Sequence, residues 1–487
     1  MNDVPAQAHR RTGMKVFFAG TMTAQACALL RYVVLARVLG PDQLGLAAIL
    51  ILTSQFLDLL TEGGITYYLI QSKDGDEPRV QSMIQLVNIL RCSFMSATLL
   101  VIAQPVADFY GRQELVHGVR MLSIAPFLLG FMHYDVRRLQ RYNRFAPEGW
   151  MLMFSEALSL AGSAAAAFIL RDSTAVAYGL AARSLVIVIV SHVVAERRYS
   201  VSFVRESWQS LSKFSWPLVI NGVLLFVCMQ GDRLFIGKQL GARELGHYAA
   251  ILLLIYYPTG ILTRLINSMH MPNIAQARED TALLNSRVDL LAGHYLLLGI
   301  SMLIGFAALM PFMVPLLYGR EFAQSVYIIA MIGFLQIARF LRGWPTAFAL
   351  ATGRSDQVLT NNIVRLIAFP LALAGQIVLT GLDGILIGFT VGEILAFAMA
   401  TFMVDRSSHR GARGDLLLIL AFIACGVAVT GGGMAVDHGQ RLQASVLIVI
   451  ALLSAGWIAL RQRAAIEQAL VLAVGALRRF SKRSIAG

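Results

Sequence analysis

The sequence predicts an all-α polytopic membrane protein with about 14 transmembrane helices, arranged as two pseudo-symmetric six-helix lobes plus two C-terminal helices. Three observations support this prediction. Apolar residues make up 57% of the chain and charged residues only 14%, whereas ordinary soluble domains carry about 25% charged residues. Many apolar runs reach the roughly 20 residues that a helix needs to cross a bilayer core of about 30 Å. Short motifs also recur, in the same order, in the two halves of the chain.

The apolar runs place the predicted spans one after another, with only short loops between them. The first half has spans at about 14–36, 44–69, 82–104, 117–135, 150–170 and 174–195. The second half has spans at about 214–238, 245–270, 290–317, 325–350, 357–380 and 384–404, and two more follow at about 415–436 and 442–460. The tail at 464–480 is shorter than a span and ends in basic residues, which predicts an interfacial helix. The short loops leave no room for a soluble domain.

Two recurring motifs define the expected domains. A shift of 201 positions places Gly40 and Gly45 on Gly241 and Gly246, and the sequence Tyr-Gly-Arg occurs at 110–112 and again, 208 positions later, at 318–320. Self-similarity at such a spacing is typical of transporters built from two related halves. We therefore expect an N-terminal lobe at 1–205, a C-terminal lobe at 206–410, and two extra helices with a basic cytoplasmic tail at 411–487.

The distribution of Lys and Arg predicts that both termini are cytoplasmic. With the N-terminus inside, the two tails and the even-numbered connections contain most of the 41 Lys and Arg residues. The opposite connections contain only Arg37, Arg112, Arg120, Arg171, Lys238, Arg243, Arg320 and Arg441. Because basic residues accumulate in cytoplasmic loops, this bias explains the net charge of +13 without a nucleic-acid partner.

The sequence shows no motif for a metal or a nucleotide, so we expect no cofactor. The four cysteines are single and lie in apolar runs, which predicts neither a disulfide framework nor a metal site. The stretch from Gly231 to Lys238 resembles a P-loop only superficially, because the spacing is wrong and Gln239 stands where Ser or Thr is required.

Charged residues inside the predicted spans are the candidate functional residues. A charge at the bilayer centre costs roughly 2.5–3.5 kcal/mol on insertion scales, so such side chains must line a polar interior, pair with one another, or extend to the interface. The acids are Asp58, Glu62, Glu156, Asp232 and Glu393, and the bases are Arg31, Arg91, Arg183, Arg233, Arg264, Arg339, Arg342 and Arg365.

The excess of arginine over acids in these spans predicts an anionic ligand. A guanidinium binds phosphate with two parallel hydrogen bonds and stays charged when it loses water. For Arg264 and the three arginines after it, extension to the cytoplasmic interface is an open alternative. For Arg91 and Arg183, which lie near mid-span, structural pairing with an acid such as Glu156 competes with ligand contact.

The repeat suggests a gate formed by Arg31 and Asp232. These residues are 201 positions apart, and each lies nine residues before its motif glycine, Gly40 or Gly241. At 1.5 Å per residue this places them about 13 Å from the outer loop, near half depth. We hypothesise that Arg31 and Asp232 pair across a cleft between the lobes in one state and separate in another. Local pairing of Asp232, for example with Arg233, is the alternative.

Four stretches carry a resemblance to a known family. They are LARVLGPDQLGLAAI at 35–49, FLDLLTEGG at 56–64, QGDRLFIGKQLGARELGHY at 230–248 and LYGREFAQS at 317–325. Their layout resembles the Wzx-type oligosaccharide flippases, polysaccharide transporters of the multidrug/oligosaccharidyl-lipid/polysaccharide exporter superfamily. The similarity extends to about Val404, and the last two predicted helices agree with fourteen-helix members.

The resemblance implies two lobes around a central cavity, alternating access, and export of an undecaprenyl-diphosphate-linked oligosaccharide across the bacterial inner membrane for surface polysaccharide. Membrane lipids and polysaccharide synthesis or polymerase proteins would be further partners.

The family's cavity walls are helices one, two, seven and eight, which here carry Arg31, Asp58, Glu62, Asp232, Arg233 and Arg264. With the mid-span residues Arg91, Glu156 and Arg183, these form the expected substrate cavity. Coupling would use H⁺ or Na⁺ through Asp58, Glu62 or Glu156, or the membrane potential.

Other functions remain open on the sequence alone. A cation-coupled drug or metabolite antiporter of the same superfamily would favour a cavity with net negative charge. A polysaccharide polymerase or ligase would need large outer loops for its catalytic residues, and the predicted outer loops are short. A major-facilitator transporter fits fourteen spans less well. A non-transporting scaffold would tolerate neutralisation of its intramembrane arginines. The interpretation we carry forward is a transporter without enzymatic activity.

Overall fold

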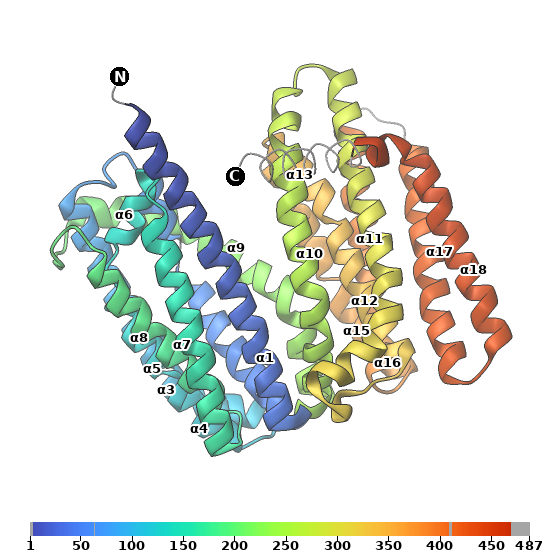
Figure 1. The fold of residues 1–487 in the computed structure, drawn as a ribbon, viewed down its shortest axis with the longest axis horizontal. Helices are drawn as coiled ribbons and strands as arrows, with labels where there is room; N and C mark the ends of the chain where they lie inside the picture. The colour runs from blue at the N-terminus through green and yellow to red at the C-terminus, as the bar shows by residue number, and fades with distance from the viewer. Residues whose placement is uncertain (1–2, 63, 409–411, 469–487) are drawn as a thin grey trace, which may run out of the picture. The chain divides into compact units, whose positions relative to one another are not determined.

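The computed structural model describes residues 3–62, 64–408 and 412–468, and within these ranges it is built of helices (Figure 1). The helices are α1 (Asp3–Glu62), α2 (Ile65–Gln71), α3 (Pro78–Tyr110), α4 (Glu114–Leu122), α5 (Ile124–Leu129), α6 (Asp135–Arg141), α7 (Ala146–Leu170), α8 (Ala175–Val193), α9 (Arg205–Gln239), α10 (Ala242–Gln276), α11 (Thr281–Tyr318), the 3₁₀ helix η1 (Arg320–Phe322), α12 (Val326–Leu341), α13 (Gly343–Ala351), α14 (Ser355–Arg365), α15 (Ala368–Val378), α16 (Leu382–Ser408), α17 (Ala412–Asp437) and α18 (Arg441–Arg461). The predicted all-α class is confirmed.

Twelve of the described helical segments are long and apolar enough to cross a membrane. The first of these, Gly13–Gln71, contains two predicted spans, because α1 is kinked at Gly40. The predicted span at 117–135 is not among the twelve, since it corresponds to the two short helices α4 and α5, which meet at Ser123. Each of the fourteen predicted spans therefore has a helical counterpart. The predicted interfacial helix at 464–480 lies largely outside the described residues.

The chain divides into two compact units. Unit 1 is formed by Met1–Ala249 and Leu317–Phe322, and unit 2 by Ala250–Leu316 and Ala323–Gly487. This division is not the predicted one, because α9, the predicted seventh span, packs against α1 and α3 in unit 1. The assignment of 1–205, 206–410 and 411–487 to two lobes and an extra helix pair stays a prediction.

The backbone supports the sequence repeat. Gly40 and Gly241, which are equivalent by the 201-position shift, have φ angles of 73° and 89°, and Gly111 and Gly319 have 68° and 107°. Residues with a Cβ rarely adopt positive φ, so a helix that ends or kinks at such a backbone angle usually has glycine there. Both pairs of motif glycines thus perform the same local task in each half of the sequence.

Small residues let the helices of each unit approach closely. In unit 1, a Cβ on Gly20 of α1 would overlap the backbone of Gly149 of α7. In unit 2, α16 carries glycines at every fourth position, and a Cβ on Gly388 would overlap the backbone of α15 at Leu371 and Ala372. Because lipid is as apolar as the helices, membrane proteins rely on this close backbone packing and not on hydrophobic burial.

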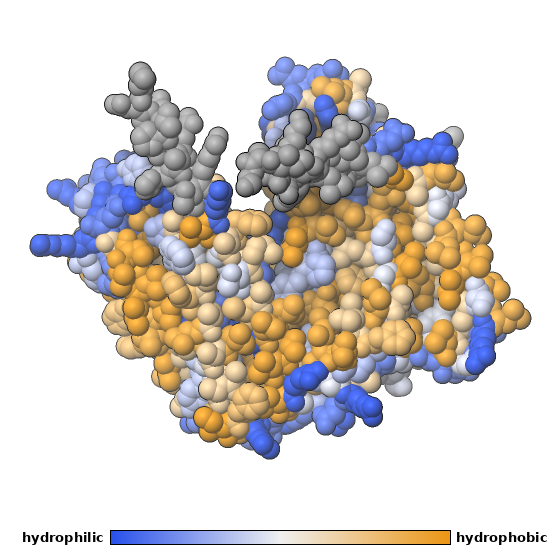
Figure 2. All heavy atoms as spheres, viewed as in Figure 1, coloured by the Kyte–Doolittle hydropathy of each residue, from blue (hydrophilic) through white to orange (hydrophobic). Residues whose placement is uncertain are grey.

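The surfaces of both units fit a lipid environment. Large apolar side chains are exposed along the helices, for example Phe18 (67%) and Ile169 (79%) in unit 1 and Ile377 (76%) and Phe312 (76%) in unit 2. Figure 2 shows apolar residues over the broad middle of each unit and hydrophilic residues toward its ends. Such an apolar surface over helices of spanning length is what a bilayer requires.

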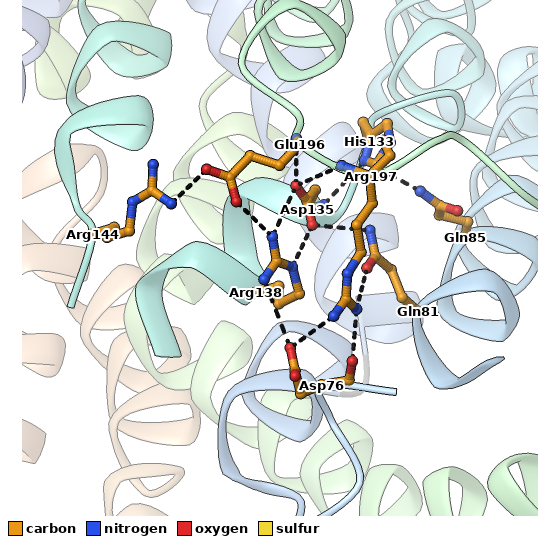
Figure 3. A network of polar contacts seen from close by, with 9 residues as sticks. All are labelled: Asp76, Gln81, Gln85, His133, Asp135, Arg138, Arg144, Glu196 and Arg197. Atoms are coloured by element: carbon orange, nitrogen blue, oxygen red, sulfur yellow. Dashed lines mark hydrogen bonds and ion pairs between the residues drawn. The ribbon is translucent and has the colours of Figure 1, made fainter. Parts of the chain in front are cut away.

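A polar network closes one end of unit 1 around the fully buried carboxylate of Asp135 (Figure 3). Asp135 Oδ1 accepts from Arg138 Nε at 2.5 Å, and Oδ2 accepts from the backbone N–H groups of Glu196 (2.7 Å) and Arg197 (3.3 Å). Arg197 in turn donates to the backbone oxygen of Asp76 at 2.6 Å. The network therefore ties α6 to the segment after α8 and to the loop before α3.

The network also determines the ionisation of Asp135 and His133. Burial raises the pKa of Asp135, but hydrogen bonds from Arg138 and from the backbone of Glu196 and Arg197 outweigh burial and hold this pKa below its ordinary value. Burial lowers the pKa of His133, although its ring also contacts the Arg197 carbonyl oxygen. The sequence accounts for the basic residues here only through membrane topology, and their spacing does not indicate a shared buried carboxylate.

Candidate functional site: an intramembrane arginine–carboxylate cavity

Unit 1 contains a polar cavity of about 290 Å³ within its predicted membrane-spanning helices. Helices α1, α3, α5, α7 and α8 supply its walls. The polar lining comprises Arg31, Ser54, Gln55, Asp58, Glu156, Arg183 and Ser184, and the rest of the lining is mainly apolar. At about 30 Å³ for each water molecule, the cavity has room for several waters among these charges.

Glu156 of α7 is at the centre of this cavity's charge network. Its Oε1 lies 2.6 Å from Arg183 Nε on α8, and its Oε2 lies 3.1 Å from Arg31 Nη1 on α1. Arg31 also donates to the hydroxyl of Ser159, which donates to the Gly179 carbonyl oxygen at 2.9 Å. One carboxylate therefore holds two guanidinium groups, one on each oxygen. The close contact of α7 with α1 and α8 is what brings the three residues together.

A second ion pair joins α3 to α1 beside this network. Arg91 Nη1 lies 3.1 Å from Asp58 Oδ1, and the Arg91 side chain is only 9% exposed whereas that of Asp58 is 48% exposed. Glu62 follows one turn after Asp58 and is half-buried. In unit 1, the cations of Arg31, Arg91 and Arg183 thus face an equal number of acids in Glu156, Asp58 and Glu62, so the predicted excess of arginine is balanced here.

The other predicted cavity residues, Asp232, Arg233 and Arg264, do not line this cavity. Asp232 of α9 is buried and accepts hydrogen bonds from the Tyr248 hydroxyl and from the Arg233 backbone N–H, the latter at 2.8 Å. Arg233 is partly buried beside it. Arg264 is exposed on the part of α10 that belongs to unit 2, so the unit 1 cavity is built without it.

Arg31 and Asp232, the residues of the predicted gate, contact different neighbours. Arg31 pairs with Glu156, and Asp232 accepts hydrogen bonds from the Tyr248 hydroxyl and the Arg233 backbone N–H. The hypothesis requires pairing in one state and separation in another, which a single structure does not test. The gate therefore stays a prediction.

Unit 2 contains a buried charge cluster of its own, around Glu393 of α16. Arg365 Nη2 lies 2.7 Å from Glu393 Oε1, Arg339 Nε lies 3.1 Å from the same oxygen, and Arg342 Nε lies 3.7 Å from Oε2. The side chains of Arg365 and Glu393 are 1% and 3% exposed. These three arginines are therefore paired inside the unit, and the alternative that they extend to an interface does not hold here.

The ion pairs of the two units occupy related places in the sequence with their charges exchanged. Glu156 and Arg183 lie on the predicted fifth and sixth spans, and Arg365 and Glu393 lie on the eleventh and twelfth, 209 and 210 positions later. Arg31 and Asp232 are exchanged in the same way, 201 positions apart. An alignment of the two halves that scored opposite charges as equivalent would have found this relationship from sequence.

The chain is similar in sequence to known polysaccharide biosynthesis proteins. Residues 34–327, more than half of the chain, match the family model described as "Polysaccharide biosynthesis protein". The succinoglycan biosynthesis transport protein ExoT of Rhizobium meliloti (strain 1021) is 25% identical over 305 residues, which is 61% of this chain and 60% of the relative. The lipopolysaccharide biosynthesis protein WzxC of Escherichia coli (strain K12) is 21% identical over 417 residues, 82% of each chain. The chain thus spans less than two thirds of the ExoT relative.

Solved structures show the same fold. The lipid II flippase MurJ in an inward closed conformation superimposes with a TM-score of 0.68 at 12% identity, over 92% of this chain and 99% of that one. An inward-facing MATE family transporter of the MOP superfamily superimposes with a TM-score of 0.64 at 13% identity, over 79% and 94%. At these identities the likeness establishes the fold alone.

Proposed function

Because the chain belongs to the polysaccharide biosynthesis protein family, we propose that it moves a polyprenyl-diphosphate-linked oligosaccharide across the bacterial inner membrane to supply a surface polysaccharide. The observation that carries this proposal is the pair of guanidinium groups, Arg31 and Arg183, held on one carboxylate in a cavity at membrane depth. A diphosphate is a ligand class whose charge and geometry suit two convergent guanidinium groups.

Glu156 acts in this proposal as the counter-ion of the empty cavity. Arginine stays protonated in proteins, so two guanidinium groups at membrane depth need an anion when no substrate is bound. The carboxylate meets that need through contacts of 2.6 Å and 3.1 Å. A diphosphate that enters the cavity would take over both arginines and leave Glu156 without a partner.

An H⁺ gradient acting through Glu156 would be one source of energy for this transport. A Na⁺ gradient acting through Asp58, which is 48% exposed, or the membrane potential acting on the anionic substrate, would be the competing energy source.

The polar head and the lipid tail of such a substrate have different requirements. The sugar and diphosphate need a wet cavity with cationic groups, whereas the polyprenyl tail can remain in the bilayer while the head crosses. In this proposal the chain is a transporter and not a polymerase or ligase, its termini are cytoplasmic, and polysaccharide synthesis proteins are its partners. The short predicted outer loops support this choice.

The test is polysaccharide export in a deletion strain complemented with wild type, Arg31→Gln, Arg183→Gln or the double variant, at equal membrane levels. Arg120→Gln, which neutralises an exposed arginine of unit 1, is the matched control. We expect loss of surface polymer and accumulation of lipid-linked intermediate in the double variant and no change in the control. Normal polymer in the deletion strain itself would refute the function, and normal polymer in the double variant would refute the role of the cavity.

A further inference from the structure

The two repeat motifs contact each other reciprocally in unit 1. A Cβ on Gly45 of α1 would overlap the carbonyl of Ala242 at the start of α10, and a Cβ on Gly246 of α10 would overlap the carbonyl of Pro41. The 201-position shift converts Gly45 into Gly246 and Pro41 into Ala242. Each motif thus places its glycine against a residue of the other motif, and the two residues contacted, Ala242 and Pro41, are equivalent by the 201-position shift.

A pair of cationic contacts repeats this exchange. Arg37 Nε donates to the carbonyl oxygen of Leu317, at the C-terminal end of α11, at 2.6 Å. Lys238 Nζ donates to the carbonyl oxygen of Phe109, at the C-terminal end of α3, and lies 4.6 Å from the Phe109 ring centroid. Arg37 and Lys238 are equivalent by the 201-position shift, and each acceptor immediately precedes a Tyr-Gly-Arg motif.

Both contacts are of the kind that stabilises helix ends. The last carbonyl groups of a helix have no partner within the helix, and cations interact favourably with them and with the helix dipole. In each case a cation from one repeat caps a helix of the other repeat. We call the residues at 37–45, 109–112, 237–247 and 317–322, all of which belong to unit 1, the motif junction.

Reciprocity of this kind is characteristic of a two-fold contact surface, in which residue i contacts j and the equivalent of j contacts the equivalent of i. The exchange is not complete. Arg112 forms two hydrogen bonds with Asp42, at 2.9 Å and 2.6 Å, but the equivalents of these residues, Arg320 and Arg243, are both basic. The reciprocal part is therefore limited to the glycine contacts and the two cationic caps.

We propose that the motif junction is a gate held closed by two equivalent latches, with Arg37 and Lys238 as its positioning residues. At the centre of the junction, backbone contacts backbone at Gly45 and Gly246, so the two motifs can separate without rearranging interlocked side chains. Each latch is one charged side chain, Arg37 or Lys238, that donates to a carbonyl group. The junction lies on the side predicted to be outside. Its role in transport rests on the proposed function, whereas its opening can be measured without any substrate.

The experiment measures how often the junction opens in purified protein in nanodiscs. Ala48 and Ala249 are equivalent, lie one turn after Gly45 and Gly246, and are 7% and 4% exposed. Each is replaced by cysteine, one at a time, in a variant from which the four native cysteines have been removed. The rate of alkylation by a soluble maleimide then reports the population of the open state.

We expect Arg37→Gln and Lys238→Gln each to raise the alkylation rate at both reporters by a similar factor, roughly three- to tenfold for the loss of one charge-assisted hydrogen bond. The double variant should raise the rate by about the product of the two factors. Arg37→Lys and Lys238→Arg keep a cationic donor and should stay within about twofold of wild type. Arg120→Gln, on an exposed arginine of the same unit, should have no effect.

A second set of variants tests the glycine contacts with the same measurement. Gly45→Ala and Gly246→Ala should both raise the rate, because the added methyl group prevents closure. Gly260→Ala should not, since no described heavy atom outside its own helix lies within 4 Å of the site of its Cβ. Circular dichroism at the assay temperature excludes unfolding as the cause. A rate unchanged by both neutralisations, or raised by only one of them, would overturn the two-latch gate.

Discussion

Arg31 and Glu156 join α1 to α7 through an ion pair of 3.1 Å between Nη1 and Oε2, although they are 125 positions apart in the chain. Their side chains are 19% and 11% exposed, so water reaches the pair without fully solvating it. The carboxylate also contacts Arg183 at 2.6 Å. This arrangement makes Glu156 the residue on which the charge state of the cavity depends.

The first prediction concerns the sharing of Glu156 by two arginines. Arg31→Gln or Arg183→Gln alone leaves Glu156 with one cation, whereas the double variant leaves the carboxylate unpaired. We therefore expect the double variant to lose about 1–3 kcal/mol more unfolding free energy than the sum of the single variants. Adding Glu156→Gln should recover most of this extra loss. Denaturant unfolding in detergent measures it, and strictly additive losses would contradict shared pairing.

The second prediction contrasts the two exchanged ion pairs. Glu393→Gln removes a carboxylate that is 3% exposed from Arg365, which is 1% exposed, and we expect a loss of about 3–5 kcal/mol of unfolding free energy. Glu156→Gln is the matched control at the related position. It should cost less, because Arg183 is 38% exposed and the cavity admits water. A larger loss for Glu156→Gln than for Glu393→Gln would contradict this account.

The third prediction concerns acid stability through Asp135. Because its pKa is below the ordinary value when folded, its contribution to stability is fully present above the unfolded pKa of about 3.9 and is lost as pH falls through the folded pKa. Asp135→Asn should cost about 1–3 kcal/mol at neutral pH and should flatten the stability profile below about pH 4. Melting temperatures from pH 7 to pH 3 measure this.

The control for this prediction is Asp74→Asn, which neutralises an exposed carboxylate in the loop before α3. We expect its melting profile to follow the wild type over the same pH range. An Asp135→Asn profile parallel to wild type in acid would show that this carboxylate does not set the acid response of unit 1.

The fourth prediction tests the backbone packing of unit 2. Gly388→Ala places a methyl group on the backbone of α15, so we expect a loss of about 1–3 kcal/mol from overpacking. Gly305→Ala in α11 has no described heavy atom outside its own helix within 4 Å of the added Cβ, and alanine is the better helix former by up to about 1 kcal/mol. The two variants should therefore shift the melting temperature in opposite directions. Equal shifts would contradict the close contact.

The fold followed from the sequence because its main signals are local. Apolar runs of spanning length predict the long helices, although not the short α6 and η1, and the motif glycines at 40, 111, 241 and 319 mark breaks at which the structure has positive φ. The broken helix α4–α5 was predicted as one span at 117–135, since hydropathy does not register the interruption at Ser123.

The site followed only in part, because pairing depends on which helices meet. The intramembrane charge rule selects Arg31, Glu156 and Arg183 and offers Glu156 as a partner for Arg183, and the structure shows that Arg31 shares the same carboxylate. The rule could not exclude Arg264, which is exposed. The 201-position repeat suggests that Arg31 pairs with Asp232 in one state, which stays a prediction, and spacing alone does not reveal that α7 brings Glu156 to Arg31.

The central claim is that the cavity exchanges Glu156 for a diphosphate. The most direct test is the binding of farnesyl diphosphate, a short polyprenyl diphosphate, to purified protein by calorimetry at pH 8. We predict that wild type binds and that Arg31→Gln/Arg183→Gln does not bind. Glu156→Gln should bind at least about tenfold more tightly than wild type, because no carboxylate competes. Equal affinity of wild type, Glu156→Gln and the double arginine variant would contradict the claim.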